Sequence, residues 1–277
     1  MKIALYGKAF GRDFDEMMQD VLRLLQESGV EIIVYEPFWN DIKHCFNDSI
    51  SYSFLKKNDD IKGKADILFS FGGDGTILDS VPIIRDSGIP VLGINTGNLG
   101  FLSSVSPKET SEAVKNIITG NYEIEQRSLI QINDEKNIFG GINYALNEVS
   151  VCRKDNGSLI VVNVFIDGML LNTYWADGII LATPTGSTAY SMSVGGPIMT
   201  PNADSFLITP IAAHNLSVRP VVIPDKSVVK VKVNGRNDKF ALGLDSRIIT
   251  ADKSMSIEIR KTEFTFNMIK MPDKNFF

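Results

Sequence analysis

The sequence has few of the side chains that usually form metal sites or disulfides. It contains two cysteines and two histidines, His44 and His214, in 277 residues. Cys45 and Cys152 lie far apart and no export signal is visible, so both are expected to be free thiols in a reducing compartment. Zinc sites use closely spaced Cys and His ligands. The composition therefore predicts no zinc cluster, no metal held by the protein alone, and a structural role for both histidines.

Long hydrophobic runs are also missing. No segment approaches the roughly 20 apolar residues of a membrane span, and the apolar part of Met1–Gly7 is too short for a signal peptide and predicts a strand. With 44% hydrophobic residues, 22% charged residues and a net charge of −5, the composition is typical of a globular cytoplasmic protein. The negative charge argues against nucleic-acid binding, and an anionic ligand would need local backbone dipoles and a few cations.

Two common nucleotide motifs are absent. There is no G-x-x-x-x-G-K-[ST], which excludes a P-loop enzyme. The glycines after the first apolar run, Gly7 and Gly11, do not have the spacing of the dinucleotide fingerprint G-x-G-x-x-G. Any nucleotide must therefore be bound by other means.

Strands and helices alternate in the first part of the chain. Apolar runs predict strands at 2–6, 31–35, 66–71 and 90–95, and apolar spacing predicts a helix over 13–28 that ends at Gly29. Ser106, Pro107 and Glu109 form a capping box for a further helix that ends at Gly120. In the less regular stretch 36–65, the residues Phe46, Ile50, Phe54 and Leu55 are compatible with one helix face. This alternation predicts an α/β domain over residues 1–121.

The helical period disappears beyond Asn121. Short alternating or apolar runs follow one another, and Asp167-Gly168 and Asn234-Gly235 are typical of tight hairpin turns. We therefore expect a β-rich domain over residues 122–277. Its last segment, 264–277, is apolar enough to pack against a domain, either the first or its own.

A glycine turn is the strongest signal for chemistry. The stretch Gly72-Gly73-Asp74-Gly75-Thr76 lies between an apolar run that predicts a strand and an apolar run that predicts a helix. Bare backbone N–H groups at such a helix N-terminus bind phosphate, and glycines let it approach closely. A carboxylate repels phosphate, so Asp74 is better suited to hold a metal or to accept a proton. The alternative is a tight turn in which Asp74 bonds only its own backbone.

Three further stretches carry polar groups suited to a nucleotide. Residues 183–197 are rich in small hydroxyl side chains, and Tyr190 supplies a ring for stacking on a base; the alternative is a surface loop. The pair Asn147-Glu148 suits a sugar diol or a purine edge, or else it is a polar bend. Asp177-Gly178 either contributes to the same site or only forms a hairpin turn.

Four stretches together resemble the NAD kinase family. They are Gly72-Gly73-Asp74-Gly75-Thr76, Asn95-Thr96-Gly97-Asn98-Leu99-Gly100-Phe101, Asn147-Glu148 and Thr183 through Pro197. They occur in the order of the family and span most of the chain. The first stretch is also similar to turns of lipid kinases and phosphofructokinases, whereas the long Thr-Pro-Thr-Gly-Ser-Thr-Ala-Tyr-Ser stretch is specific.

The resemblance implies an N-terminal Rossmann-like α/β domain and a C-terminal β-rich domain with the active site between them, in a homodimer or homotetramer. It implies transfer of the γ-phosphoryl group of ATP, or of polyphosphate in some members, to the 2′-hydroxyl of the adenosine ribose of NAD. Mg²⁺ or another divalent cation is expected to arrive with ATP, because no residue pattern defines a metal cage. NAD and ATP are then the partners, with no nucleic acid and no membrane.

Site residues follow from the same resemblance. Asp74 is implied to accept the proton of the hydroxyl. The implied binding residues are Gly72, Gly73, Gly75, Thr76, Phe101, Asn147, Glu148, Asp177, Thr185, Thr188, Ala189, Tyr190, Ser191, Met192, Ser193 and Ala212, with Asn95 as a further candidate. The chain departs from the family pattern at Trp175, where many relatives have Arg, and at Ser158 and Arg247. These departures affect the expected salt bridges to the dinucleotide.

Two other functions compete with this interpretation. A lipid kinase would need an apolar cleft, which the hydroxyl-rich stretch 183–197 does not favour. A nucleotide sensor without activity would not need Asp74, which is present.

Overall fold

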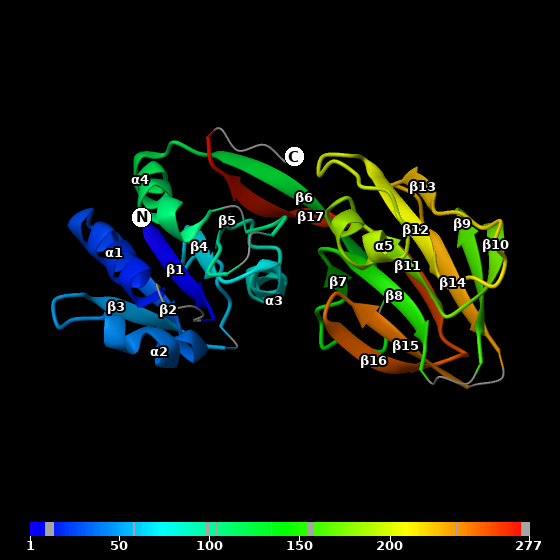
Figure 1. The fold of residues 1–277 in the computed structure, drawn as a ribbon. Helices are drawn as coiled ribbons and strands as arrows, with labels where there is room; N and C mark the ends of the chain where they lie inside the picture. Colours follow the sequence, from blue (N-terminus) through cyan, green and yellow to red (C-terminus); the bar gives the residue numbers. More distant parts are fainter. Residues whose placement is uncertain are drawn as a thin grey trace. The chain divides into compact units, whose positions relative to one another are not determined.

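The structure is a computed structural model. It describes residues 1–8, 14–57, 59–97, 100–103, 105–133, 135–154, 158–235 and 238–272. Two compact units make up the chain (Figure 1). Unit 1 comprises Met1–Gln126 and Phe266–Phe277, and unit 2 comprises Arg127–Thr265. No helix among the described residues is long and apolar enough to cross a membrane.

Unit 1 is built on a parallel sheet in the order β3-β2-β1-β4-β5. Its strands are β1 (Lys2–Gly7), β2 (Glu31–Tyr35), β3 (Tyr52–Leu55), β4 (Ile67–Phe71) and β5 (Val91–Ile94). The helices are α1 (Phe14–Glu27), α2 (Glu36–Ile42), α3 (Asp74–Ile84) and α4 (Thr110–Thr119), with short 3₁₀ turns η1 (Lys43–Cys45) and η2 (Pro107–Glu109). Strands buried between helices explain the apolar runs of the sequence.

The predicted helix ends are found in the structure. Gly29 follows α1 with φ of 67° and Gly120 closes α4 with φ of 75°, both in the left-handed region that favours glycine. The capping box is formed, since the Ser106 N–H donates to Glu109 Oε2 over 3.0 Å.

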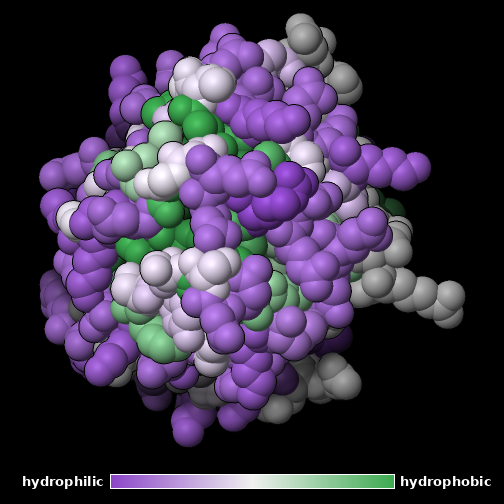
Figure 2. Space-filling model, turned by 90° about the vertical axis from the view of Figure 1, so that its left-hand side faces the viewer, coloured by the Kyte–Doolittle hydropathy of each residue, from purple (hydrophilic) through white to green (hydrophobic). Residues whose placement is uncertain are grey.

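The irregular stretch differs from its prediction. Phe54 and Leu55 lie in strand β3, while Phe46 and Ile50 lie between η1 and that strand, so the four residues do not share a helix face. Parallel pairing of β3 with β2 outweighs the weak helical spacing. Phe46 and Phe54 instead join Trp39 and Tyr52, whose rings stack 4.6 Å apart, in an aromatic cluster. The face drawn in Figure 2 shows hydrophobic residues between hydrophilic ones.

Unit 2 contains two sets of antiparallel strands around a second core. One sheet has the order β13-β12-β11-β8-β15-β16, and the other set runs β10-β9-β14-β17. The strands are β6 (Glu123–Ile132), β7 (Tyr144–Ala145), β8 (Glu148–Arg153), β9 (Ile160–Ile166), β10 (Met169–Ala176), β11 (Gly178–Ala182), β12 (Ser205–Ile211), β13 (Val221–Pro224), β14 (Val229–Asn234), β15 (Lys239–Leu244), β16 (Arg247–Asp252) and β17 (Ser256–Lys270). Two short helical turns, η3 (Thr185–Thr188) and α5 (Tyr190–Ser193), interrupt the strands. The fold class of α/β plus a β-rich part is confirmed.

The turn at Asp167-Gly168 is formed by adjacent residues, whereas the strand β17 is held by partners that are distant in sequence. Asp167 and Gly168 have φ of 49° and 84°, as a two-residue hairpin requires. The strand β17 runs without a break over 15 residues, Ser256–Lys270. Its first part pairs with β14 in unit 2, and its last part pairs with β5 in unit 1 through Met268 and Val91. Partners on different units keep it extended over its whole length.

Candidate functional site

The glycine turn lies at the switch point of the unit 1 sheet. Strand β1 has β2 on one side and β4 on the other, so the loops after β1 and β4 lead to opposite sides. Gly7 and Phe71, the last residues of these two strands, are register partners. Ligands of open α/β sheets bind outside the carboxyl ends of the strands at such a point. Residues Gly72–Thr76 follow β4 directly, and Lys8 follows β1.

Lys8 is a cation beside this turn that sequence reasoning did not single out. Its Nζ lies 2.9 Å from Asp79 Oδ2, and its backbone N–H donates to Phe71 O over 3.0 Å. Asp79 lies one helical turn after Gly75 in α3. The pairing of β1 with β4, which is a long-range contact, is what brings Lys8 here.

The three glycines of the turn have different physical roles. Gly72 has φ of 149°, and an added Cβ would lie 2.2 Å from Thr76 Oγ1, so its conformation and packing both require glycine. Gly73 is the N-cap of α3. Gly73 and Gly75 are exposed, and an added Cβ at either would meet nothing within 4 Å. They leave the N-terminus of α3 open to an anion.

The Asp74 carboxylate is held by the loop after β5. Its Oδ2 accepts the Phe101 N–H over 2.8 Å, and its Oδ1 accepts the N–H groups of Leu102 and Ser103, each over 3.0 Å. The Ser103 hydroxyl adds a bond of 3.1 Å to Oδ1. A Cβ at Gly100 would lie 2.2 Å from Asp74 Oδ1. The carboxylate therefore has a fixed orientation, half-buried between two exposed glycines.

The second motif leads from β5 to this carboxylate. Asn95 is buried, and its Oδ1 accepts the Gly97 N–H over 2.6 Å, which shapes the turn. Phe101 keeps 48% of its surface exposed. Asn98 and Leu99 lie outside the described residues.

In unit 2 a carboxylate from a distant hairpin organises the pair Asn147-Glu148. Asp245 lies in the turn between β15 and β16 with φ of 52°. Its Oδ1 accepts the N–H groups of Asn147 and Glu148 over 2.8 and 3.1 Å, and its Oδ2 accepts the Leu146 N–H over 2.8 Å. Burial raises the pKa of Asp245, against these three donors and the Arg247 guanidinium, which lower it. Asp245 lies about a hundred residues from its partners, so no local motif indicates it.

Glu148 in unit 2 is strongly perturbed by its surroundings. Burial, together with the charge of Asp245, raises the pKa of Glu148 to about 8. Its Oε2 is buried and has no hydrogen-bond partner within the described part of the chain. An unpaired buried carboxylate oxygen is costly, and such groups are concentrated where ligands bind.

The hydroxyl-rich stretch divides into buried and exposed side chains. Thr183, Thr185, Ser187 and Ser191 are buried. The Ser187 hydroxyl bonds Pro184 O over 2.6 Å, and the Ser191 and Thr209 hydroxyls lie 2.9 Å apart. These groups hold the segment in place. Among the predicted binding residues of this stretch, those left half-buried or exposed are Thr188, Ala189, Tyr190, Met192 and Ser193.

Gly186 brings this stretch against the Asn147-Glu148 pair. An added Cβ would lie 2.1 Å from Asn147 O. The Thr183 N–H donates to the same carbonyl over 2.9 Å, and β8 pairs with β11 so that Glu148 faces Ala182. Glu148 and Thr183, which are 35 residues apart in sequence, thus bring their two motifs together.

Tyr190 lies close enough to Asp177 and Glu148 for their charges to act on it. Glu148 and Cys152 are half-buried positions on the same face of β8, about 13 Å apart along the strand. Burial raises the pKa of Tyr190, followed by the charges of Cys152, Asp177 and Glu148. The Asp177 carboxylate pairs with Arg153 at 3.1 Å.

The remaining predicted residues lie near the end of β10 or in the hairpin of Asp245. Ala212 follows β12 with φ of 46°, next to Asp177, whose N–H donates to Ile211 O over 2.9 Å. Trp175 is 58% exposed and pairs with Val161 of β9. Ser158, which is half-buried, lies three residues before Val161. Arg247 donates to the backbone carbonyls of Ile142 and Tyr144. Its guanidinium is thus engaged within the protein.

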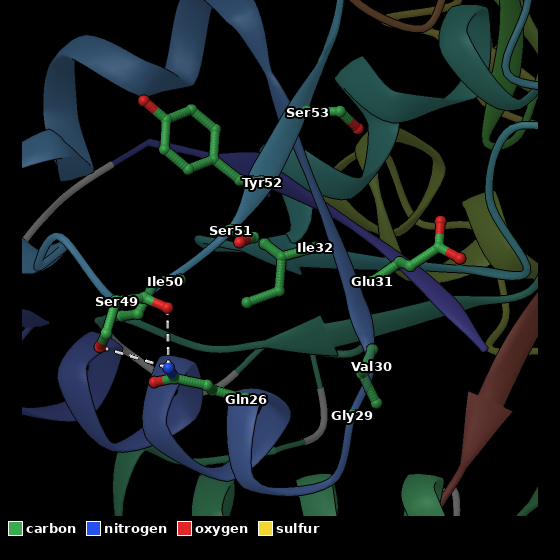
Figure 3. A pocket seen from close by; sticks show the side chains of 10 residues that line it. All are labelled: Gln26, Gly29, Val30, Glu31, Ile32, Ser49, Ile50, Ser51, Tyr52 and Ser53. Carbon is green, nitrogen blue, oxygen red and sulfur yellow. Dashed lines mark hydrogen bonds between the residues drawn. The ribbon is translucent and has the colours of Figure 1, made fainter.

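A separate hollow in unit 1 contains none of these residues. A cavity of about 370 Å³ lies between the end of α1, β2 and β3 (Figure 3). Gln26 Nε2 donates to Ser49 O over 2.9 Å at its wall. Its one charged lining residue, Glu31, pairs with Lys2 at 3.3 Å, so the hollow offers little to a phosphate.

Comparison with known proteins agrees with this geometry. Residues 4–122 match the model of the ATP-NAD kinase N-terminal domain, and residues 146–271 match that of the ATP-NAD kinase C-terminal domain. The chain is 38% identical to the NAD kinase of Cytophaga hutchinsonii over 279 residues, covering 100% of this chain and 95% of the relative. It is 39% identical to the NAD kinase of Flavobacterium johnsoniae over 278 residues, with the same two coverages.

The chain belongs to the NAD kinase family. Solved structures agree: a yeast NADH kinase complexed with NADH superposes with a TM-score of 0.85 at 26% identity, covering 99% of this chain and 84% of the other. An NAD kinase from Archaeoglobus fulgidus in complex with ATP gives 0.75 at 25% identity, covering 98% and 94%. This family member is a phosphotransferase that transfers the γ-phosphoryl group of ATP to the 2′-hydroxyl of the adenosine ribose of NAD, giving NADP.

Proposed function

We propose that Asp74 accepts the proton of the NAD 2′-hydroxyl during phosphoryl transfer. The observation that carries the proposal is the fixed carboxylate at the first turn of α3, bonded to residues 101–103 and flanked by the open glycines Gly73 and Gly75. Phosphoryl transfer depends on positioning and charge neutralisation more than on covalent chemistry. A carboxylate that is already oriented loses no freedom when the hydroxyl arrives.

The phosphate groups are assigned to the same turn. The backbone N–H groups of Gly73 and Gly75 at the start of α3 would receive phosphate oxygens, while the Thr76 N–H donates to Gly73 O over 2.9 Å and closes the turn. Lys8 adds a positive charge at the adjacent strand end, where it can exchange its partner Asp79 for phosphate. This arrangement agrees with a protein whose net charge is −5 and which must bind a polyanion through local groups.

Mg²⁺ or another divalent cation is proposed to arrive with ATP. The two carboxylates of this region are engaged, Asp74 with the 101–103 loop and Asp79 with Lys8. The donor set therefore fits an ion held mainly by phosphate oxygens and water, as Mg²⁺ prefers. When bound, the ion would neutralise charge on the transferring group.

The NAD-binding residues are proposed in unit 2. Glu148, with its unpartnered Oε2, and Asn147 are assigned to the adenosine part. Tyr190 would stack on a base, with Asp177 and Ala212 beside it. The remaining contacts are assigned to Thr188, Ala189, Met192 and Ser193, with Phe101 of unit 1, while Thr185 and Ser191 act by holding the segment. Asn95 shapes the loop after β5. Ser158, Trp175 and Arg247 are assigned to the edge of the NAD site.

Assembly, donor and location complete the proposal. The Archaeoglobus relative is in complex with ATP, the donor of this reaction. A homodimer or homotetramer in the cytoplasm follows from the family resemblance, and two free cysteines agree with a reducing compartment.

Asp74→Asn tests the central assignment. If Asp74 is the base, kcat should fall about 10²–10⁴-fold, while the dissociation constant of NAD changes far less. Asp86→Asn, an exposed aspartate of the same unit, is the matched control and should retain its kcat. A folded Asp74→Asn protein with near-normal kcat would contradict the role of base.

Asp74 also anchors a loop, so the same variant needs a structural measurement. Hydrogen exchange of the Phe101, Leu102 and Ser103 amides reports whether the loop stays in place. Ser103→Ala removes one of the four bonds but leaves the carboxylate. If Ser103→Ala lowered kcat as much as Asp74→Asn, loop anchoring and not proton transfer would explain the loss.

A further inference from the structure

Three side chains with different metal-binding groups converge in unit 1. Asp15 lies in the first turn of α1, and His44 and Cys45 end the 3₁₀ turn η1. His44 Nε2 lies 2.9 Å from Asp15 Oδ1, and Cys45 Sγ lies 3.9 Å from the same oxygen. The three ligand atoms all lie within 4.8 Å of one another.

These separations are close to those of a tetrahedral zinc site. Zinc binds nitrogen and oxygen at about 2.0–2.2 Å and sulfur at about 2.3 Å, which puts ligand atoms about 3.3–3.7 Å apart. The observed 2.9 and 3.9 Å bracket that range. The side chains of Asp15 and His44 are 58% and 54% exposed, so both can adjust by small rotations. Their exposure also leaves a fourth position for water.

The charges and donor types select the class of ion. A carboxylate, a thiolate and a neutral imidazole carry two negative charges together, which one divalent cation balances. Thiolate and imidazole favour zinc-class ions over Mg²⁺, which prefers oxygen. An ion pair between Asp15 and His44 would account for those two side chains alone. The buried Cys45 thiol donates to the same oxygen and to Asp15 O, each over 3.9 Å, so a third metal-binding group joins this pair.

We propose that Asp15, His44 and Cys45 form a binding site for a divalent ion of the zinc class that links the start of α1 to η1. The sequence predicted no such cluster, and this proposal departs from that prediction. Only the adjacent pair His44-Cys45 is visible in the sequence, because Asp15 is brought to it by the packing of α1 against η1. The site is independent of the kinase reaction.

Cobalt titration of the untagged, EDTA-treated protein, without nucleotide, tests the proposal. Co²⁺ should bind with one equivalent and give a thiolate-to-cobalt charge-transfer band with the intense visible bands of tetrahedral cobalt. Zn²⁺ should displace it and raise the Tm. Absence of a thiolate band in the wild-type protein would overturn the proposal.

Variants assign the ligands. Cys45→Ser and His44→Gln should each weaken Co²⁺ binding by more than about 100-fold, beyond the cost of losing a supporting group. Cys152→Ser, which changes the other free thiol, is the matched control and should keep the band. His44 is exposed, so His44→Gln remains informative if Cys45→Ser fails to fold. A band that persists in either ligand variant, or is lost in Cys152→Ser, would refute the assignment.

Discussion

Asp74 and Asp245 have the same structural task in the two units. Each carboxylate accepts successive backbone N–H groups of a segment that is remote in sequence, residues 101–103 in one case and 146–148 in the other. Charge-assisted bonds of this kind are about twice as strong as neutral ones. They hold two binding loops in place without a covalent link. Single substitutions around them should therefore have effects well beyond their own contacts.

Gly100→Ala tests the packing around Asp74. An added Cβ would lie 2.2 Å from Asp74 Oδ1, so the loop or the carboxylate must move. We expect a loss of about 1–3 kcal/mol in the free energy of unfolding, faster amide exchange at 101–103 and at least about a tenfold lower kcat.

Gly97→Ala is the matched control in the same loop. An added Cβ there would meet nothing within 4 Å, and its φ is not in the left-handed region. Its free energy of unfolding should change by less than about 0.5 kcal/mol in urea titrations. Equal losses for the two variants would contradict the proposed contact.

Glu148 predicts a specific pH dependence of stability. Burial raises the pKa of Glu148 to about 8 from its ordinary value of 4.5. Between these values the folded protein keeps a proton that the unfolded chain has lost. The free energy of unfolding therefore falls as pH rises from about 4.5, and the loss is complete above about 8.

Glu148→Gln removes this titration. The variant should match the wild type near pH 5 and be more stable above pH 8, with Tm measured across that range. Glu123→Gln changes an exposed carboxylate and should leave the pH profile unchanged. A wild-type profile that stayed flat between pH 5 and 8 would show that Glu148 is not protonated in the folded state.

At the scale of elements, the buried hydroxyl of Thr183 holds the segment 183–188 in place. The Thr183 hydroxyl donates to Leu146 O over 2.5 Å and accepts the Gly186 N–H over 3.1 Å, with no exposed surface. Thr183→Val keeps the shape but leaves both groups unpaired. We expect a loss of about 2–4 kcal/mol in the free energy of unfolding and a higher KM for NAD.

Thr188→Val is the matched control within η3. It removes one bond, to Thr185 O over 3.1 Å, from a half-buried side chain. Its cost in chemical denaturation should stay below about 1 kcal/mol. If the two valine variants were equally stable, the hydroxyl-rich stretch would be held by packing and not by these bonds.

Elements with local signals could be predicted, and elements made by distant pairing could not. The ends of α1 and α4 follow from Gly29, Gly120 and the Ser106–Glu109 capping box, which act within a few residues. Strand β3 exists because it pairs with β2, and β17 is continuous because its two parts have different partners. Neither cause is visible in a local pattern.

The same distinction applies to the candidate site. Asp74 and Asn147-Glu148 stand in recognisable motifs, so the sequence identified them. Lys8 and Asp245 stand in none, because strand pairing and a hairpin bring them to those motifs from far along the chain. Sequence reasoning also treated the hydroxyls of 183–197 as one group, whereas burial separates the supporting residues from the exposed ones.

At the scale of the molecule, each unit has its own core, but the chain crosses between them more than once. Unit 1 takes Ile269 and Met271 from the end of the chain into a core that contains Ile3, Leu5 and Phe69. The core of unit 2 is made by residues between Ile130 and Ile259. Residues at the C-terminal end of β17 and just after it therefore contribute to the core of unit 1.

Ile269→Ala tests this dependence. Ile269 is 2% exposed, and truncation of a buried isoleucine should cost about 2–5 kcal/mol in the free energy of unfolding. Ile124→Ala is the matched control: it makes the same change at a residue of unit 1 that is 51% exposed, and should cost less than about 1 kcal/mol. If the units unfold in separate transitions, hydrogen exchange should show lost protection in β1, β4 and β5 of Ile269→Ala, with β11 and β15 of unit 2 unchanged. Equal losses of stability in the two variants, or loss of protection confined to unit 2, would show that the C-terminal segment does not belong to the core of unit 1.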